Sequence, residues 1–421
     1  MKEVMPVQFA RLDTERIKGY KELLDFYHGR QWEGRERRRE RRLAFNYAKV
    51  FVDKITSYLM SGINFAVAHH GDYGWLSSPA GVWRAEMTAV SLDLSADITG
   101  LRQEQDVNSG GLTVELRNDD GRYAAPGQGD IAVLDLGCQL DISPGYVTPA
   151  GNEVSAGQSY SFESYEHTSA GGSASLILHA RDGWGALGDW KARCQFRWNK
   201  ASDEMSVRDI IAFVLARAGL QLEVVSSSSV ITGFYPDFTI NSGNSGGQVI
   251  RKLLSFVPDV LLLEGNKAYI INPLASDSSV YGYGGGHPVR EGKYVQKAWE
   301  LNRVQVEGYD SGAAAGIVVD NFNWNGIDRC YDRLAYIEDR NIGTAAEAQQ
   351  RGQAYLREAE IASGGGAVLV PVNCGQQLYD VVDITDSRAG LDAARHRVVR
   401  LALVYDPRRG EYRQRLWLGR V

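Results

Sequence analysis

Histidine is the residue type in this chain that most directly offers metal or acid–base chemistry, but its spacing supports neither. The histidines stand in no HExxH motif and in no other zinc-binding pattern. His69 and His70 are adjacent, and adjacent side chains on an extended chain point to opposite sides. We therefore predict no metal-binding residues and no bound cofactor. The seven histidines are His28, His69, His70, His167, His179, His287 and His396.

Paired carboxylates are a second candidate, because glycosidases use two of them around the bond that they cleave. Glu338-Asp339 and the pair Asp383 and Asp386 have this form. Such pairs are also common on solvated strands and loops. We predict no catalytic residues among them and expect the chain not to be an enzyme.

The glycine cluster Gly282–Pro288 invites comparison with a phosphate-binding loop. Five residues, instead of four, separate Gly286 from the Gly292-Lys293 pair, and Tyr294 stands where that motif needs serine or threonine. The cluster therefore predicts a flexible loop.

The cysteines predict scattered, buried thiols in a reducing compartment, because they lie far apart and form no CxxC pair. They are Cys138, Cys194, Cys330 and Cys374. Met1–Arg16 has no apolar core of signal-peptide length, and no segment approaches the roughly 20 apolar residues that span a bilayer. We expect synthesis in the host cytoplasm and no membrane insertion.

The first 66 residues differ from the rest in charge and in pattern. They contain 14 Lys or Arg and nine Asp or Glu, a net charge of +5, whereas residues 67–421 carry −11. Apolar residues recur at helical spacing in Arg16–Tyr27 and again in Leu43–Met60, so both segments are predicted helices. Between them, Arg35–Arg42 holds six arginines and two glutamates, which fit either a solvated face or contact with phosphates.

This segment resembles the opening of tailed-phage portal proteins. The resemblance rests on RIKGYKELLDFYHGRQW (Arg16–Trp32) and RRLAFNYAKVFVDKITSYLMSG (Arg41–Gly62), and it covers about residues 1–66. Nothing after Phe65 continues it. The resemblance implies a role around DNA, with non-specific contact through Arg35–Arg42.

From Trp83 onward the chain is patterned mainly as strands, after a linker at 67–82 that has no periodicity. Short alternating segments with turns between them predict a first β-barrel-like domain at 83–195. The predicted strands there are Met87–Leu94, Leu112–Leu116, Ile131–Leu134, Gln139–Ser143, Ser159–Glu166 and Ala174–Ala180.

The middle of the chain, 196–275, predicts a small α+β domain. Ser206 and Ser245 stand as N-caps before two apolar-striped helices, and Gly265-Asn266 joins two strands as a hairpin. Leu220–Val225 and Phe234–Ile240 are further predicted strands.

Residues 276–421 predict a second β-barrel-like domain with one helix, which opens at the capping box Thr344–Glu347. In the last strand, the alternation in Tyr412–Leu418 places arginines on one or both faces of the strand. A strand that lines a water-filled passage or a subunit interface would require this. The fold class is therefore mainly β with an α+β insertion, preceded by a helical segment. The predicted strands are Trp299–Gly308, Gly316–Asn321, Ala367–Val372, Asp380–Thr385, His396–Tyr405 and Glu411–Gly419.

Residues 83–421 are similar to tailed-phage tail or baseplate hub proteins. The match is carried by Leu112–Tyr123, Leu136–Glu153, Ser206–Leu220, Gly246–Pro273 and Gly375–Gly419. The resemblance implies two β-barrel domains that assemble as a ring of three or six copies at the distal end of the tail tube. Its implied partners are the tail tube, the tape-measure protein and the tail-tip proteins, in the virion of a phage or prophage. It implies no catalytic residues.

Three other functions stay open from the sequence. The head alone favours a truncated portal-like DNA-ring protein. The 21 tyrosines and nine tryptophans on a β scaffold would suit a receptor- or carbohydrate-binding tail protein, although most stand at positions that a core would use. The carboxylate pairs would suit a cell-wall hydrolase.

Overall fold

The computed structural model describes residues 91–149, 151–155, 157–296, 300–309 and 316–421, together with the backbone of two short strands further upstream. The chain divides into two compact units, Met1–Asp93 and Leu94–Val421. In the first, β1 (Ser77–Ser78) pairs antiparallel with β2 (Gly81–Val82), inside the predicted linker. The predicted helices of the first 66 residues, Arg35–Arg42 and the histidines upstream of residue 71 lie outside the described residues.

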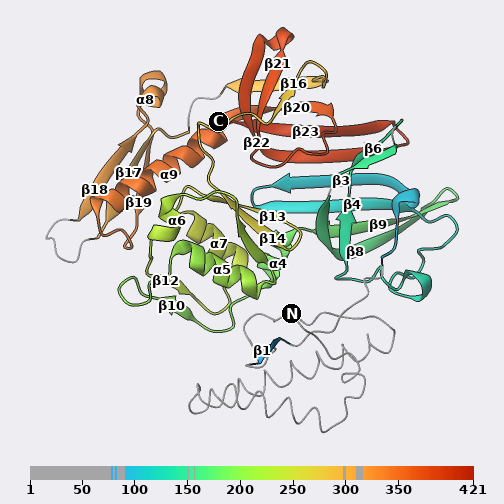
Figure 1. Cartoon of the computed structure of the whole chain (residues 1–421), viewed down its shortest axis with the longest axis horizontal. Coiled ribbons are helices and arrows are strands. Elements are labelled where there is room, and N and C mark those ends of the chain that lie inside the picture. The colour runs from blue at the N-terminus through green and yellow to red at the C-terminus, as the bar shows by residue number, and fades with distance from the viewer. Residues whose placement is uncertain are drawn as a thin grey trace, which may run out of the picture. The chain divides into compact units, whose positions relative to one another are not determined.

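The second unit is mainly β and is built around one sheet of eleven strands (Figure 1). In spatial order the sheet runs through β16 (Glu291–Gln296), β20 (Gly364–Pro371), β23 (Glu411–Gly419), β22 (Leu391–Asp406), β3 (Ile98–Asp106), β4 (Ser109–Arg117), β9 (Ser173–Arg181), β8 (Gln158–Ala170) and β5 (Gln139–Ile142). Two more strands extend it sideways, because β21 (Val381–Asp386) pairs with β22, and β15 (Tyr281–Tyr283) pairs with β21.

The long strand β22 joins strands from both predicted barrel-like domains. Its residues Leu391–Arg397 pair with β21, whereas Arg400–Tyr405 of the same edge pair with Leu101–Asp106 of β3. The mainly β class is confirmed, but the two predicted barrels are not: no sheet closes on itself in the described residues, and both regions contribute to one sheet. At 16 residues, β22 is long enough to take two partners along one edge. The predicted domain boundaries themselves stay predictions.

The middle region is an α+β unit, as predicted. Its sheet has the order β11 (Gln221–Val224), β14 (Lys267–Ile271) and β13 (Val260–Glu264), and a separate pair joins β10 (Phe196–Trp198) to β12 (Phe238–Ile240). Its helices are α4 (Gly183–Asp189), α5 (Val207–Arg217), α6 (Ser229–Gly233) and α7 (Gly246–Leu254). Ser206 with Asp209, and Ser245 with Gln248, form reciprocal capping boxes, so both predicted helix starts are confirmed.

A third sheet, of order β18 (Ile317–Phe322), β17 (Arg303–Gly308) and β19 (Leu334–Glu338), carries helix α9 (Ala345–Ser363) along one face (Figure 1). Thr344 is the predicted N-cap, and its hydroxyl accepts the Glu347 N–H. The other half of the predicted capping box differs, because the Glu347 carboxylate accepts the Gly343 N–H. Val304, Val306, Ile342 and Ala348 form the buried core between them. A short helix, α8 (Trp324–Cys330), connects β18 to β19.

Several predicted elements differ from the structure, because apolar residues can be buried without belonging to a strand. The prediction of a strand at Ile131–Leu134 is wrong, since Gly129–Ile131 is a 3-10 turn. Ile131 and Leu134 lie in a loop, and their apolar side chains are buried in the core. The strand predicted at Phe234–Ile240 is confined to β12. Other elements of the second unit were not predicted. They are the strands β3, β10, β15, β16 and β19, the helices α4, α6 and α8, and the hairpin of β6 (Gly145–Thr148) with β7 (Gly151–Val154).

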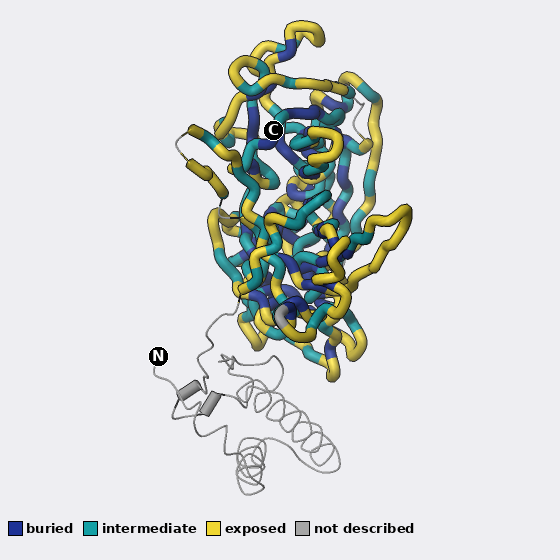
Figure 2. The backbone as a smooth tube through the Cα atoms, turned by 90° about the vertical axis from the view of Figure 1, so that its right-hand side faces the viewer, coloured by how far each residue is buried: buried dark blue, intermediate teal, exposed yellow. Residues whose placement is uncertain are grey.

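Figure 2 shows buried residues running through the interior of the second unit and exposed ones along its loops. No helix of the described residues is long and apolar enough to cross a membrane.

Arg397 of β22 is the largest fully buried side chain, with 2% of its surface exposed. Its guanidinium donates to the carbonyl oxygens of Tyr379 at 2.9 Å and Leu274 at 2.8 Å, and to the Asp277 carboxylate at 2.9 Å. It therefore holds the segment that leaves the α+β unit against the main sheet.

We predict that Arg397→Met lowers the free energy of unfolding by about 3 kcal/mol, because it leaves two carbonyls and a carboxylate without their donor. Guanidinium denaturation followed by circular dichroism measures this. The control is Arg408→Met, whose side chain is 66% exposed and whose loss we expect to cost less than about 0.5 kcal/mol. Equal effects of the two substitutions would contradict the role given to Arg397.

Candidate assembly surface

The two faces of the main sheet differ in chemistry, and the strand register shows how. Residues directly opposite each other in antiparallel strands share a face. Gln103 of β3 lies opposite Leu112 of β4 and Leu403 of β22, all of them buried. The alternate residues form a polar face, in which Arg102 lies opposite Thr113, and Thr113 opposite His179.

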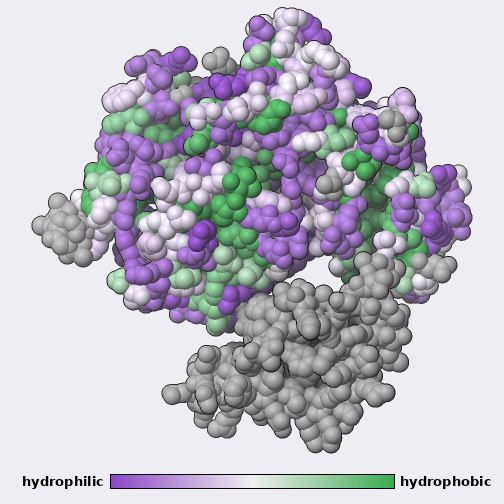
Figure 3. Space-filling view, viewed as in Figure 1, coloured by the Kyte–Doolittle hydropathy of each residue, from purple (hydrophilic) through white to green (hydrophobic). Residues whose placement is uncertain are grey.

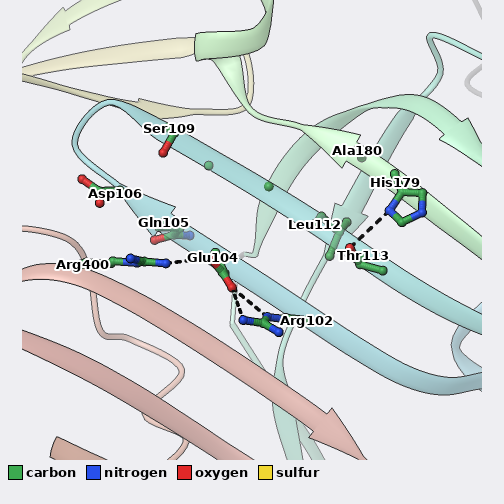
Figure 4. A pocket seen from close by; sticks show the side chains of 12 residues that line it. Arg102, Glu104, Gln105, Asp106, Ser109, Leu112, Thr113, His179, Ala180 and Arg400 are labelled. Carbon is green, nitrogen blue, oxygen red and sulfur yellow. Dashed lines mark hydrogen bonds and ion pairs between the residues drawn. The ribbon is translucent and has the colours of Figure 1, made fainter. Parts of the chain in front are cut away.

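A hollow of about 510 Å³ lies on this polar face where β22, β3, β4 and β9 run side by side (Figure 4). Gly110 and Gly111 form part of its wall. Because glycine has no side chain, they contribute only backbone atoms to the lining. The charged side chains at its rim come from β3 and β22. The hollow therefore sits on the junction between the two halves of the sheet.

Glu104 is held between two arginines in this hollow. Its carboxylate accepts from Arg102 Nε at 2.7 Å and from Arg400 NH2 at 2.9 Å, so one ion pair lies within β3 and the other crosses to β22. Partial burial alone would raise the pKa of Glu104, but the two arginines outweigh it and lower the pKa. The carboxylate stays charged, and the exposed setting makes each pair worth about 1 kcal/mol or less.

Thr113, His179 and Glu166 form a row of hydroxyl, imidazole and carboxylate beside the hollow. The Thr113 hydroxyl is 3.4 Å from His179 Nδ1, and Glu166 is 3.4 Å from His179 Nε2. The second approach lacks hydrogen-bond geometry, since Nε2 has no hydrogen-bond partner. The Thr113–His179 separation exceeds the roughly 2.6–3.2 Å at which a base takes a proton from a hydroxyl, and the His179–Glu166 separation exceeds the same range for the bond that would orient that base. The row does not support a catalytic triad.

Behind the hollow, buried amides tie β3 to β8 on the apolar face. Gln103 donates to the Tyr160 hydroxyl at 2.9 Å and to the Gln158 amide oxygen at 3.0 Å, and the Tyr160 hydroxyl donates to the same oxygen at 2.8 Å. Gln105 also donates to Gln158. Because buried polar groups are costly when unpaired, this network fixes the relation of β3 to β8.

The carboxylates considered from the sequence are engaged in local structure. Asp383 accepts from the Ser279 hydroxyl, and Asp386 accepts from the Tyr294 hydroxyl at 3.0 Å and pairs with Arg388. Asp339 accepts the Asn341 N–H at 2.9 Å, while its neighbour Glu338 is exposed on β19. Three of the four carboxylates therefore serve as local hydrogen-bond acceptors.

The described histidines and cysteines also stand apart. In the described residues no group of three or more His, Cys, Asp or Glu side chains could hold a metal ion. His287 bonds the Tyr281 hydroxyl and the Pro371 carbonyl, which anchors the glycine-rich loop after β15. The four cysteines are free thiols, but the prediction that they are buried is wrong: Cys194 is exposed, and Cys138, Cys330 and Cys374 are half-buried.

The sequence does contain one GxSxG pattern of the serine-hydrolase type, at Gly243–Gly247, which the sequence-based prediction missed. In a hydrolase that serine occupies a strained turn. Here Ser245 has φ −79° and ψ 152°, the ordinary conformation of a helix N-cap, and its hydroxyl accepts the Gln248 N–H at 3.3 Å. The motif is a capping box.

Comparisons with known proteins give a fold and no family. No family model matches the chain, and no curated protein matches it. Among solved structures, a tail protein of Neisseria meningitidis MC58 matches with a TM-score of 0.57 and 14% identity, over 77% of this chain and 92% of that one. The 43 kDa tail protein of prophage MuSo2 from Shewanella oneidensis matches with 0.52 and 16% identity, over 77% and 94%.

The prophage tail protein gp18 of Listeria monocytogenes EGD-e matches with a TM-score of 0.51 and 10% identity, over 80% of this chain and 91% of that one. The chain shares the fold of these tail proteins. The resemblance of the body to tail proteins is thereby supported at the level of fold. The resemblance of the head to portal proteins concerns residues outside the described ones.

Asp182 adds a titratable group behind the wall of the hollow. It caps α4 by accepting the Trp184 N–H at 2.9 Å, and burial raises its pKa to about 7 despite that bond. Gly110 makes room for it, since a Cβ there would lie 2.5 Å from the Asp182 carboxylate.

We predict that the protein loses stability as pH rises from about 4 to about 7, because the folded state keeps a proton on Asp182 that the unfolded chain has already released. Asp182→Asn keeps a good N-cap and should flatten this slope in urea denaturation series. Asp209→Asn is the control: ion pairing and hydrogen bonds lower the pKa of Asp209 although burial opposes them, so its effect falls below that range. An unchanged slope in Asp182→Asn would refute the assignment.

Proposed function

We propose that the chain is a structural protein of a tailed phage or prophage and forms a hub ring at the distal end of the tail tube. The observation that carries this is the fold, which covers 91–94% of three tail proteins. Proteins that share a fold can differ in function, so the ring is argued from the surface of this chain.

Two free strand edges support the ring. At one end of the main sheet, Ser164–Ala170 of β8 pair with β9 along one edge, and no described strand pairs with the other. At the opposite end, β16 pairs only with β20 among the described strands. Unpaired edges seek partners, and a contact between two unlike edges repeats head to tail until it closes. Both edges carry charged residues, Glu163 and Glu166 on β8 and Glu291 and Lys293 on β16.

The polar face supports a water-filled passage. Arg102, Glu104 and Arg400 leave this face charged and hydrated, while the opposite face is packed core. Arg415 on β23 continues the charged row, as the alternation of the last strand predicts. In the proposed ring this face lines the channel for the tape-measure protein and DNA. The face of the unit drawn in Figure 3 mixes hydrophilic residues with separate apolar patches, where tail-tube and tail-tip proteins would bind.

The test of the ring is the double variant Ser164→Lys with Thr168→Lys, since lysines on an edge strand oppose edge pairing. We expect the unaltered chain to be a trimer or hexamer by light scattering after size exclusion, and the variant to be a monomer with unchanged melting temperature. The matched control adds the same charge at exposed loops, Ser202→Lys with Ser242→Lys. A monomeric unaltered chain, or an oligomeric variant, would reject the edge-paired ring.

We also propose that the chain has no catalytic activity. The engaged aspartates, the ordinary N-cap at Ser245 and the long Thr113–His179 separation support this. We expect no dye release from dye-labelled peptidoglycan above a buffer blank, with a cell-wall hydrolase as positive control. Release that survives repurification, and is lost in Ser245→Ala or Thr113→Val, would overturn the proposal.

A further inference from the structure

The three-stranded sheet β18-β17-β19 buries one face under α9, and no described element covers the other face. Alternate residues show this: Val304 and Val306 are buried against α9, whereas the residues between them face away. Large apolar side chains nevertheless occupy the uncovered face and the adjoining start of α8. We call this set the aromatic face; its exposed fractions are Val318 55%, Phe322 37%, Trp324 63%, Leu334 52% and Tyr336 54%.

The register makes these residues neighbours. Arg303 in the central strand lies opposite Phe322 on one side and Leu334 on the other, and Gln305 lies between Asp320 and Tyr336 in the next row. Trp324 joins the set by stacking on Phe322, with ring centroids 4.6 Å apart and planes at 17°. Contiguous exposed apolar side chains of this kind mark interaction sites.

The anchor of this face is already held in place. The Arg303 guanidinium lies 5.2 Å from the centre of the Phe322 ring, and salt bridges of 2.9 Å to Asp320 and Asp332 fix it. Arginine, phenylalanine and tryptophan thus form one stack before any partner arrives. Tryptophan, tyrosine and arginine dominate binding energy at protein interfaces, and a preorganised side chain loses little entropy on binding.

The charge on this face selects the partner. Glu307 and Glu338 stand directly opposite each other on neighbouring strands, an arrangement that repels. Neither carboxylate has an ion-pair partner among the described residues. A lysine or arginine brought between them would remove this repulsion, and nearby ring faces also attract cations. The same face of a second copy would bring glutamate against glutamate.

We infer that the aromatic face, with Glu307 and Glu338, is a docking surface for another protein, one that presents a segment in which apolar and basic side chains alternate. The surface lies outside the eleven-stranded sheet and its free edges. It is therefore independent of the proposed ring, and either can fail without the other.

The test uses short fluorescein-labelled peptides in which leucine alternates with lysine, glutamine or glutamate, titrated with the full chain and followed by fluorescence anisotropy. We expect the lysine peptide to bind at least about tenfold more tightly than the glutamine peptide, a difference of about 1.4 kcal/mol. Trp324→Ala and the double variant Glu307→Gln with Glu338→Gln should each weaken the lysine peptide by a similar factor. The glutamate peptide should not bind.

The matched control removes the same charge elsewhere, in Glu153→Gln with Glu358→Gln, both exposed, and should leave binding unchanged. Equal weakening by this control would mean that the acidic chain attracts any basic peptide and would overturn the proposal. So would a Trp324→Ala variant that binds normally while its melting temperature shows it folded. Chito-oligosaccharide binding that depends on Trp324, without lysine-peptide binding, would assign the face to carbohydrate instead.

Discussion

The change of partner along β22 is the constraint on which the second unit depends. Pairing with β21 ends at Arg397, and pairing with β3 begins at Arg400. Between these points the register with β23 on the other edge shifts, so a bulge accompanies the change of partner. A bulge bends a strand and increases its twist, which lets one strand belong to two differently directed groups of neighbours. Arg397, buried beside the bulge, bonds the carbonyls of the segments that cross there.

From this strand outward, each face of the sheet has its own role. Toward the core, a glutamine and tyrosine network replaces part of the apolar packing and relates β3 to β8. Toward water, Arg400 reaches Glu104 across the same junction. The sheet that results keeps two edges free, and we regard these edges, rather than a cleft, as the basis of the proposed assembly. The three-stranded sheet β18-β17-β19 offers a separate exposed face, which is apolar and acidic.

Local signals predicted local structure well. The structure confirms the serine N-caps of α5 and α7, the threonine N-cap of α9 and the turn at Gly265-Asn266. Each of these depends on hydrogen bonds between residues that are close in the sequence. β3 was missed because its inward residues, Gln103 and Gln105, are polar and leave no apolar alternation to detect. Its partner strand Leu112–Leu116 and the turn before it were the available signal. The joining of both β regions through β22 depends on contacts nearly 300 residues apart, which no local pattern contains.

Candidate surfaces were harder to predict than elements, because alternation shows that two faces differ and not which one is covered. From the sequence, most tyrosines and tryptophans were placed at core positions, and Phe322, Trp324 and Tyr336, which are exposed, were not singled out. The arginines of the last strand were placed correctly on a solvated side because few cores accept arginine. Arg397 is the exception, and its burial follows from three acceptors that meet there from distant segments.

The bulge in β22 also limits how this protein can change its length over evolution. Deleting one residue there would slide Arg400–Asp406 by one position and turn Arg400 toward the core while Leu401 and Leu403 faced water. Selection should therefore remove insertions and deletions from this strand. It should tolerate them at the tips of the β6–β7 and β22–β23 hairpins, where the chain is not held in register with a neighbouring strand. Divergent lineages of this protein should differ in size at those tips and keep the strand length constant.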